Sequence, residues 1–416
     1  MMPVRKCRMN CVHTAIQWCL MPLCCAVLVA CSTPPRKPAL NDTSLQSATI
    51  DGFNDVRFVP STPEGVNAYL GELKRVVPLR DKQPAGTSYY LSLSGGGDNG
   101  AFGAGILTGW SKRGDRPVFD QVVGISTGSL VAPFAFLGAD YDAQLETVFT
   151  TVSPGDIYKQ RGLYAIISGD SLADNTPLLR LIEKHIDQVM LEQIAQAYER
   201  EGRLLLIGTT NIDTGQLVIW NMGHIAALRS EASAALFHRI MLASAAVPGM
   251  FPAALFDAEV NGQAHHELHV DGGLSVQIYL YPAAVSKKAI AQGIIKPRKR
   301  EAYIIRNATI SVGSENTEPS SLGVLTRSYK KIIQSQGVGN LYQIYQIAQR
   351  DKVGFNLAFI GDDFKAPHPD EFDQGYMKAL FAYGYQKALH GYPWGKSPPG
   401  FDESTREDIQ AQSRRN

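Results

Sequence analysis

One pentapeptide, Gly124-Ile125-Ser126-Thr127-Gly128, constrains the fold of this 416-residue chain more than any other stretch. The apolar pair Val122-Val123 precedes it, and a helical pattern of small residues follows. Glycines on both sides of a serine permit a sharp strand-to-helix turn, where larger side chains would block the close approach of the two elements. Such a turn lifts the serine hydroxyl above a sheet, beside a helix N-terminus that favours negative charge. Ser126 is therefore a candidate nucleophile between the elbow glycines Gly124 and Gly128, although glycine-rich loops also carry this pattern by chance.

A second glycine-rich segment, Gly95-Gly96-Gly97-Asp98-Asn99-Gly100, follows a predicted strand over Ser88–Ser94 and opens a predicted helix over Ala101–Trp110. Backbone N–H groups gathered at such a loop suit an anion. The anion is either the oxyanion of an acyl-transfer intermediate or a dinucleotide pyrophosphate, for which Asp120 would be the ribose-binding acid. Asp120 opens a strand instead of ending one, which favours the oxyanion.

A serine nucleophile needs a proton acceptor, and Asp271 is the strongest candidate. It stands at a predicted strand end, and Gly272 and Gly273 follow it. A buried carboxylate can accept the serine proton if burial raises its pKa towards the working pH. Asp-Gly is also a common turn pair. Alternatively, His368 or His390 would complete a Ser–Asp–His triad, but both lie in polar or proline-rich surroundings.

Composition narrows the remaining classes of function. The chain is 44% hydrophobic and 19% charged with a net charge of +1, which is ordinary for a globular protein and gives no case for nucleic acid. The basic run Lys296–Arg300 is typical of a solvated loop. His265, His266 and His269 lack the helical spacing of a zinc site, so we expect neither a metal nor a cofactor.

The N-terminal region has the pattern of a secretory signal. All six cysteines lie in the first 31 residues, where Arg5, Lys6 and Arg8 precede an apolar run from about Ile16 to Ala30. The sequence Leu28-Val29-Ala30-Cys31 resembles the bacterial lipobox, in which the cysteine becomes lipid-modified; the alternative is an ordinary signal peptide. The lipobox predicts membrane attachment through a lipid anchor in the bacterial cell envelope. A serine after Cys31 favours the outer membrane, facing the periplasm.

Strands alternate with helices along the rest of the chain, which predicts an α/β fold with a mostly parallel central sheet. We expect a signal peptide over 1–30, a flexible tether and edge segment over 31–87, a catalytic domain over 88–310 and a mainly helical extension over 311–416. Within the extension, a helix over Leu325–Arg350 is expected to break near Gly337–Gly339. Its apolar positions indicate either core packing or a lid or lipid-facing surface beside Ser126.

Four blocks together resemble the patatin-like phospholipase family. They are the glycine loop Gly95–Gly100, the elbow Gly124–Gly128, the block Ala243–Pro252 and Asp271-Gly272-Gly273. The resemblance implies a three-layer α/β/α fold and a Ser–Asp dyad of Ser126 and Asp271. It also implies hydrolysis of a lipid or acyl ester through an acyl-enzyme, usually as a phospholipase A or lysophospholipase.

In this resemblance, the oxyanion hole is formed around Gly95, Gly96, Gly97, Asp98 and Gly100. Many family members carry Lys or Arg where this chain has Asn99, which weakens the case for a phosphate contact there. Two alternatives remain: an acyltransferase with the same dyad, and a non-catalytic membrane-anchored lipid-binding protein.

Overall fold

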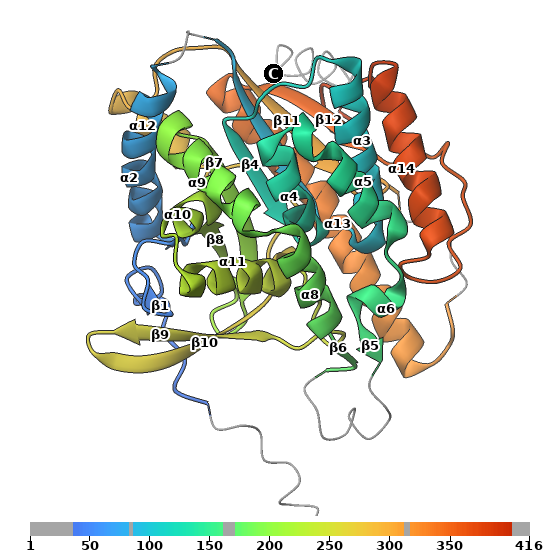
Figure 1. Ribbon diagram of the computed structural model, residues 1–416, viewed down its shortest axis with the longest axis horizontal. Coiled ribbons are helices and arrows are strands. Elements are labelled where there is room, and N and C mark those ends of the chain that lie inside the picture. The colour runs from blue at the N-terminus through green and yellow to red at the C-terminus, as the bar shows by residue number, and fades with distance from the viewer. Residues whose placement is uncertain (1–35, 83–85, 161–170, 312–316, 402–416) are drawn as a thin grey trace, which may run out of the picture.

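The computed structural model describes residues 36–82, 86–160, 171–311 and 317–401 (Figure 1). The strands are β1 (Thr49–Ile50), β2 (Arg57–Phe58), β3 (Ser88–Leu93), β4 (Gln121–Ile125), β5 (Lys159–Gln160), β6 (Ala173–Asp174), β7 (Leu204–Asn211), β8 (Gln216–Asn221), β9 (Ala254–Val260), β10 (Gln263–Asp271), β11 (Arg300–Arg306) and β12 (Gly354–Phe359). The α-helices are α2 (Pro63–Arg80), α3 (Gly100–Arg113), α4 (Thr127–Leu137), α5 (Asp142–Thr151), α6 (Pro154–Ile157), α8 (Thr176–His185), α9 (Gln188–Glu201), α10 (Met222–Ala227), α11 (Glu231–Ser244), α12 (Val285–Ala291), α13 (Ser321–Asp351) and α14 (Gln374–Leu389). Short 3₁₀ turns lie at Gly97–Asn99, Ala139–Tyr141 and Gly272–Leu274.

One large sheet organises the described part of the chain. Its main path runs β1-β9-β10-β7-β4-β3-β11-β12, and β8 joins β7 to β2. The strands β7, β4, β3, β11 and β12 run parallel to one another, whereas β8, β9 and β10 are antiparallel additions at one side. The expected fold class, α/β with a mostly parallel central sheet flanked by helices, is confirmed.

Each face of the sheet carries its own apolar core, because successive residues of a strand point to opposite faces. Val122, Leu205 and Ile305 pack with helices that include α3, α4, α11 and α14. Their neighbours on the same strands, such as Val123 and Leu206, pack with α2, α12 and α13 on the other face. The result is three layers, with helices visible on both sides of the sheet (Figure 1).

The C-terminal region belongs to this layered structure. β12 pairs with β11, and α14 lies along α3 (Figure 1). Glycines make the two helices approach closely: a Cβ on Gly105 would lie 2.1 Å from the Phe381 carbonyl oxygen, and one on Gly109 would lie 2.3 Å from that of Tyr385. The small-residue pattern of α3 is therefore a helix-packing surface.

Two local expectations were wrong. α13 is continuous through Gly337–Gly339, and Gly337 provides room for the Arg306 guanidinium, which a Cβ would approach to 2.1 Å. The segment expected to be a flexible tether is ordered from residue 36: Arg36 pairs with Asp213, and Leu45 is fully buried. Residues 1–35, with the signal sequence and Cys31, lie outside the described residues. Among the described helices, none is long and apolar enough to cross a membrane.

Candidate active site

The elbow at Ser126 has the backbone strain that its glycines permit. Ser126 adopts φ 55° and ψ −127° directly before α4. A Cβ on Gly124 would lie 2.4 Å from the Gly128 carbonyl oxygen, and one on Gly128 would lie 2.4 Å from that of Leu93. Side chains at either glycine are therefore excluded by backbone atoms. A non-glycine residue at positive φ in this tight turn is a strained feature typical of functional sites.

Sheet register brings Ser126 and Asp271 together. β4 and β10 meet end to end along the same edge of β7: Ile125 pairs with Gly208, and Asp271 pairs with the next residue, Thr209. β4 runs parallel to β7 and β10 antiparallel, so their C-terminal ends point at each other. The Ser126 hydroxyl donates a hydrogen bond of 2.6 Å to Asp271 Oδ2.

The Asp271 carboxylate is buried and suited to hold a proton at mildly acidic pH. Burial raises its pKa to about 6, against the opposing effect of hydrogen bonds from Ser126 and the Gly273 amide. The Gly273 N–H donates to Asp271 Oδ1 at 2.6 Å, which leaves Oδ2 facing the serine. A carboxylate with this pKa can accept a proton near neutral pH and return it later.

The block Ala243–Pro252 supports both residues from behind. The Ser126 N–H donates to Ser244 Oγ at 3.0 Å, and that hydroxyl donates to the Gly208 carbonyl at 2.7 Å. The Asp271 N–H donates to the Ala246 carbonyl at 2.9 Å. One segment thus connects the serine elbow, the strand β7 and the carboxylate.

The glycine loop lies against Ser126. A Cβ on Gly95 would lie 3.0 Å from Ser126 Cβ, which is tighter than most Cβ contacts, so glycine favours this close approach. The Gly95 N–H donates to the Gln277 carbonyl, and the Gly100 N–H donates within the 3₁₀ turn. These two amides are therefore occupied, contrary to the expected set of oxyanion donors. The amides of Gly96, Gly97 and Asp98 bond to no acceptor among the described residues.

Side chains from the C-terminal region hold this loop, which sequence reasoning missed. Asp98 Oδ2 accepts from the Phe372 N–H at 2.9 Å and lies 2.7 Å from His368 Nε2. The Tyr376 hydroxyl donates to Asn99 Oδ1 at 2.5 Å. His368 and Tyr376 stack with ring centroids 3.9 Å apart. The Asn99 side chain is thus engaged by an aromatic hydroxyl.

The two histidines considered for a Ser–Asp–His triad, His368 and His390, have other hydrogen-bond partners. Neither His368 nor His390 hydrogen bonds to Ser126 or Asp271; His390 contacts a carbonyl of its own helix. Within the described residues, no group of histidine, cysteine and acidic side chains could hold a metal. Asp120 lies at the opposite end of β4 from Ser126, where its carboxylate accepts from the Tyr89 amide, which disfavours dinucleotide binding.

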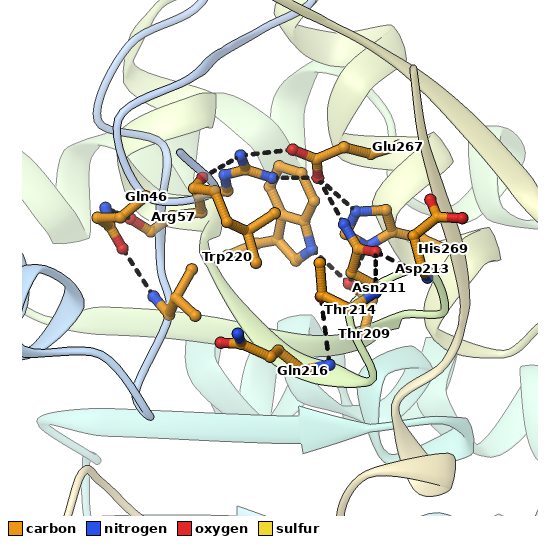
Figure 2. Close-up of polar contacts among 12 residues, drawn as sticks. Gln46, Arg57, Thr209, Asn211, Asp213, Thr214, Gln216, Trp220, Glu267 and His269 are labelled. Carbon is orange, nitrogen blue, oxygen red and sulfur yellow. Dashed lines mark hydrogen bonds and ion pairs between the residues drawn. The ribbon is translucent and has the colours of Figure 1, made fainter. Parts of the chain in front are cut away.

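A buried polar network holds β10, the strand that ends at Asp271 (Figure 2). Arg57 Nη2 donates to Glu267 Oε1 at 2.8 Å, and Glu267 Oε2 lies 2.9 Å from His269 Nε2. Thr209 Oγ1 accepts from the Trp220 indole at 2.7 Å and lies 2.8 Å from His269 Nδ1. Burial lowers the pKa of His269. The neutral ring therefore links β7 to β10 two residues before the carboxylate.

A family model and a solved structure are similar to parts of this chain. Residues 91–280 match the family model described as Patatin-like phospholipase, so the chain carries a patatin-like phospholipase domain over this range. An alignment with the crystal structure of VipD from Legionella pneumophila covers 74% of this chain and 67% of that chain, at 10% identity and a TM-score of 0.34. No curated protein matches the chain.

Proposed function

We propose that the protein is a serine lipid acyl hydrolase of the phospholipase A or lysophospholipase type. The observation that carries the proposal is the 2.6 Å hydrogen bond from Ser126 to Asp271, a buried carboxylate whose pKa is raised to about 6. The patatin-like phospholipase domain over residues 91–280 supports a lipid substrate.

The proposed reaction uses one nucleophile, one base and a set of amides. Ser126 Oγ attacks the acyl carbonyl carbon as its proton passes to Asp271 Oδ2. The carbonyl oxygen becomes an oxyanion, which the amides of Gly96, Gly97 and Asp98 stabilise. Collapse of this intermediate expels the alcohol, which takes the proton from Asp271, and leaves an acyl-enzyme. Water then attacks the acyl carbon, gives a proton to Asp271, and releases the carboxylic acid as Ser126 is protonated again.

The first half of α13 supports a lipid-facing surface near this site. Val324, Leu325 and Ile332 are exposed by 53%, 66% and 65%, and the exposed Lys330 and Lys331 lie beside them. Apolar and basic residues together suit the surface of an anionic membrane. Gln336 of the same helix donates to the Ser275 carbonyl at 2.8 Å, four residues after Asp271, which supports a position of α13 beside the site.

Attachment to the bacterial envelope through Cys31 is a separate proposal that rests on Leu28–Cys31 alone. A clickable palmitate analogue fed to expressing cells should label the wild-type protein and not Cys31→Ser. Equal labelling of both proteins would refute this anchor.

A fluorophosphonate probe tests the catalytic proposal directly. We expect a covalent adduct on Ser126, mapped by mass spectrometry, and no adduct in Ser126→Ala. Asp271→Ala should lose hydrolysis of a soluble ester, whereas His390→Ala should retain it. If the wild-type protein forms no adduct even with detergent present, the proposal fails and a lipid-binding role is favoured. An adduct without hydrolysis would favour acyl transfer to another acceptor.

A further inference from the structure

A second pocket lies at the opposite end of the sheet from Ser126. It is formed between α2, α12 and the N-terminal ends of β3, β4 and β11, and it opens to solvent. Ser88, Gln121 and Arg300 line it at the first residues of those strands. β3 spans six residues from this pocket to the glycine loop, so the pocket and Ser126 are roughly 20 Å apart.

The pocket lining is strongly basic. Arg80, Lys296, Arg298 and Arg300 contribute to it, and no acidic residue does. Asp81 pairs with both Lys296 and Arg298, so these two cations share one carboxylate. The remaining cations, Arg80 and Arg300, are the ones that could meet a ligand.

Arg80 is buried without a close anionic partner. Its side chain is 9% exposed, its Nε donates to the Gly202 carbonyl at 2.7 Å, and Asp120 Oδ1 is 4.0 Å from that nitrogen. Its Nη2 is buried and has no hydrogen-bond partner among the described residues. A buried charged donor left unpaired is costly, so this nitrogen marks a position for an acceptor.

Arg300 adds a second cation to the same pocket. Its guanidinium donates to the Ser286 hydroxyl and the Asp351 carbonyl, and it forms no ion pair with a carboxylate in the described part of the chain. Burial raises the pKa of Tyr90, while Arg80 and Arg300 both act to lower it. Arg80, Arg300 and Tyr90 all line this pocket.

The remaining walls are largely apolar. Leu73 and Val77 of α2 face the pocket together with Val285 and Ile295. An apolar wall beside an unpaired guanidinium suits a ligand that combines a chain with an anionic head.

We propose that this pocket binds an oxyanion that carries an alkyl chain, with its head paired to Arg80 and its chain against Leu73, Val77, Val285 and Ile295. A carboxylate or phosphate head satisfies the Arg80 donor, and the chain covers the apolar wall. The site lies apart from Ser126 and does not depend on the proposed hydrolase activity.

Titration calorimetry in detergent-free buffer tests the proposal with five probes. They are octanoate, octyl phosphate, acetate, inorganic phosphate and octanol. We expect octanoate or octyl phosphate to bind the wild-type protein, and the tighter of the two identifies the head group. The other three probes should bind at least tenfold more weakly, because each lacks the chain or the charge.

Two arginines of the same helix give a matched pair of variants. Arg80→Gln should weaken binding about tenfold or more, whereas Arg75→Gln, in which an exposed arginine paired with Glu72 is replaced, should bind like wild type. Ile295→Trp is a second variant, for use if Arg80→Gln does not fold. It fills the pocket and keeps its charges, and it should lose binding of the alkyl ligand.

Three results would overturn the proposal. One is no binding of either alkyl anion. Another is equal affinity in wild type, Arg80→Gln and Ile295→Trp, which would place the ligand elsewhere, for example near Ser126. The third is acetate or inorganic phosphate binding as tightly as its alkyl counterpart, which would leave the apolar wall without a role.

Discussion

His368 Nε2 lies 2.7 Å from Asp98 Oδ2, although the two residues are 270 positions apart in the chain. Asp98 belongs to the glycine loop beside Ser126, whereas His368 lies outside the range 91–280 that matches the family model. Tyr376 stacks on the histidine ring and bonds Asn99 of the same loop. The C-terminal region therefore holds the loop that carries the proposed oxyanion donors.

Removing this contact should slow the reaction more than it weakens substrate binding. We expect His368→Ala to lower kcat on a soluble ester by about tenfold with little change in KM, because the amides next to Asp98 are then less well placed. His368→Gln, which keeps a donor, should restore part of the rate. His390→Ala is the matched control, since that ring contacts only its own helix. An unchanged kcat in His368→Ala would show that the contact has no role in positioning.

The pKa of Asp271 predicts the pH profile of the reaction. Protonated Asp271 cannot accept the Ser126 proton, and its pKa is raised to about 6. kcat/KM should therefore rise about tenfold per pH unit below 6 and level off above it. Rates on a soluble ester from pH 4.5 to 8 measure this, with circular dichroism to verify folding at each pH. A profile without a transition in this range would exclude Asp271 as the base.

The burial of Asp271 should lower the free energy of unfolding at neutral pH, where the carboxylate is charged. Its pKa is higher in the folded protein than in the unfolded chain, so the folded state holds the proton more strongly between about pH 4 and pH 6. The stability contribution of Asp271 is thus present below this window and lost as pH rises through it. Asp271→Asn should raise the free energy of unfolding at pH 7 by about 1–3 kcal/mol, and by less at pH 4. Urea titrations at both pH values measure this; a variant less stable at pH 7 would contradict it.

A pair of exposed valines tests the proposed lipid-facing surface. Val324 on α13 is 53% exposed and Val189 on α9 is 62% exposed. Val324→Asp should reduce activity on anionic phospholipid vesicles about tenfold and leave activity on a soluble ester unchanged. Val189→Asp should affect neither assay. Equal losses on vesicles and soluble ester would count against a membrane contact at α13.

Two glycines in α13 predict opposite effects on stability. A Cβ on Gly339 meets no atom within 4 Å, so Gly339→Ala should stabilise the protein by about 0.5–1 kcal/mol through helix propensity. A Cβ on Gly337 would lie 2.1 Å from Arg306 Nη1, so Gly337→Ala should destabilise it by about 1–3 kcal/mol. Thermal unfolding of both variants measures the difference. Stabilisation by Gly337→Ala would show that Arg306 moves away freely.

The features that could be predicted from the sequence are those that a few neighbouring residues determine. Gly124 and Gly128 are needed by the geometry of one turn, so the elbow and the strand before it are readable from a few residues. The apolar run Leu204–Ile207 predicts a buried strand, and β7 begins with this run and continues to Asn211. Asp271 was readable as a strand-end carboxylate. Its distance from Ser126 was not, because that distance depends on β4 and β10 meeting along β7.

The features that could not be predicted from the sequence depend on contacts between distant segments. The contact between His368 and Asp98 leaves no local signal, because each residue looks ordinary in its own segment. Pro60 and Pro63 predict only a short helix and turns over Phe53–Val77. Pro63 instead stands in the first turn of α2, where proline is tolerated, and the helix continues to Arg80. β10 extends back to Gln263 through a polar stretch, where Glu267 is buried against Arg57. Gly337 and Gly339 predict a break because glycine has a low helix propensity. The helix is continuous, and the absence of a side chain at Gly337 makes room for Arg306, which lies far away in the sequence.

The position of β3 in the sheet bears on how the chain matures during synthesis. β3 pairs with β4 soon after it leaves the ribosome, but its other neighbour is β11, which begins at Arg300. About two hundred residues therefore separate the two partners, which at 5–20 residues per second is roughly 10 to 40 s of translation. During that interval one edge of a central apolar strand lacks its partner and can pair with other chains. The nascent chain is therefore most exposed to aggregation at this edge until β11 has emerged.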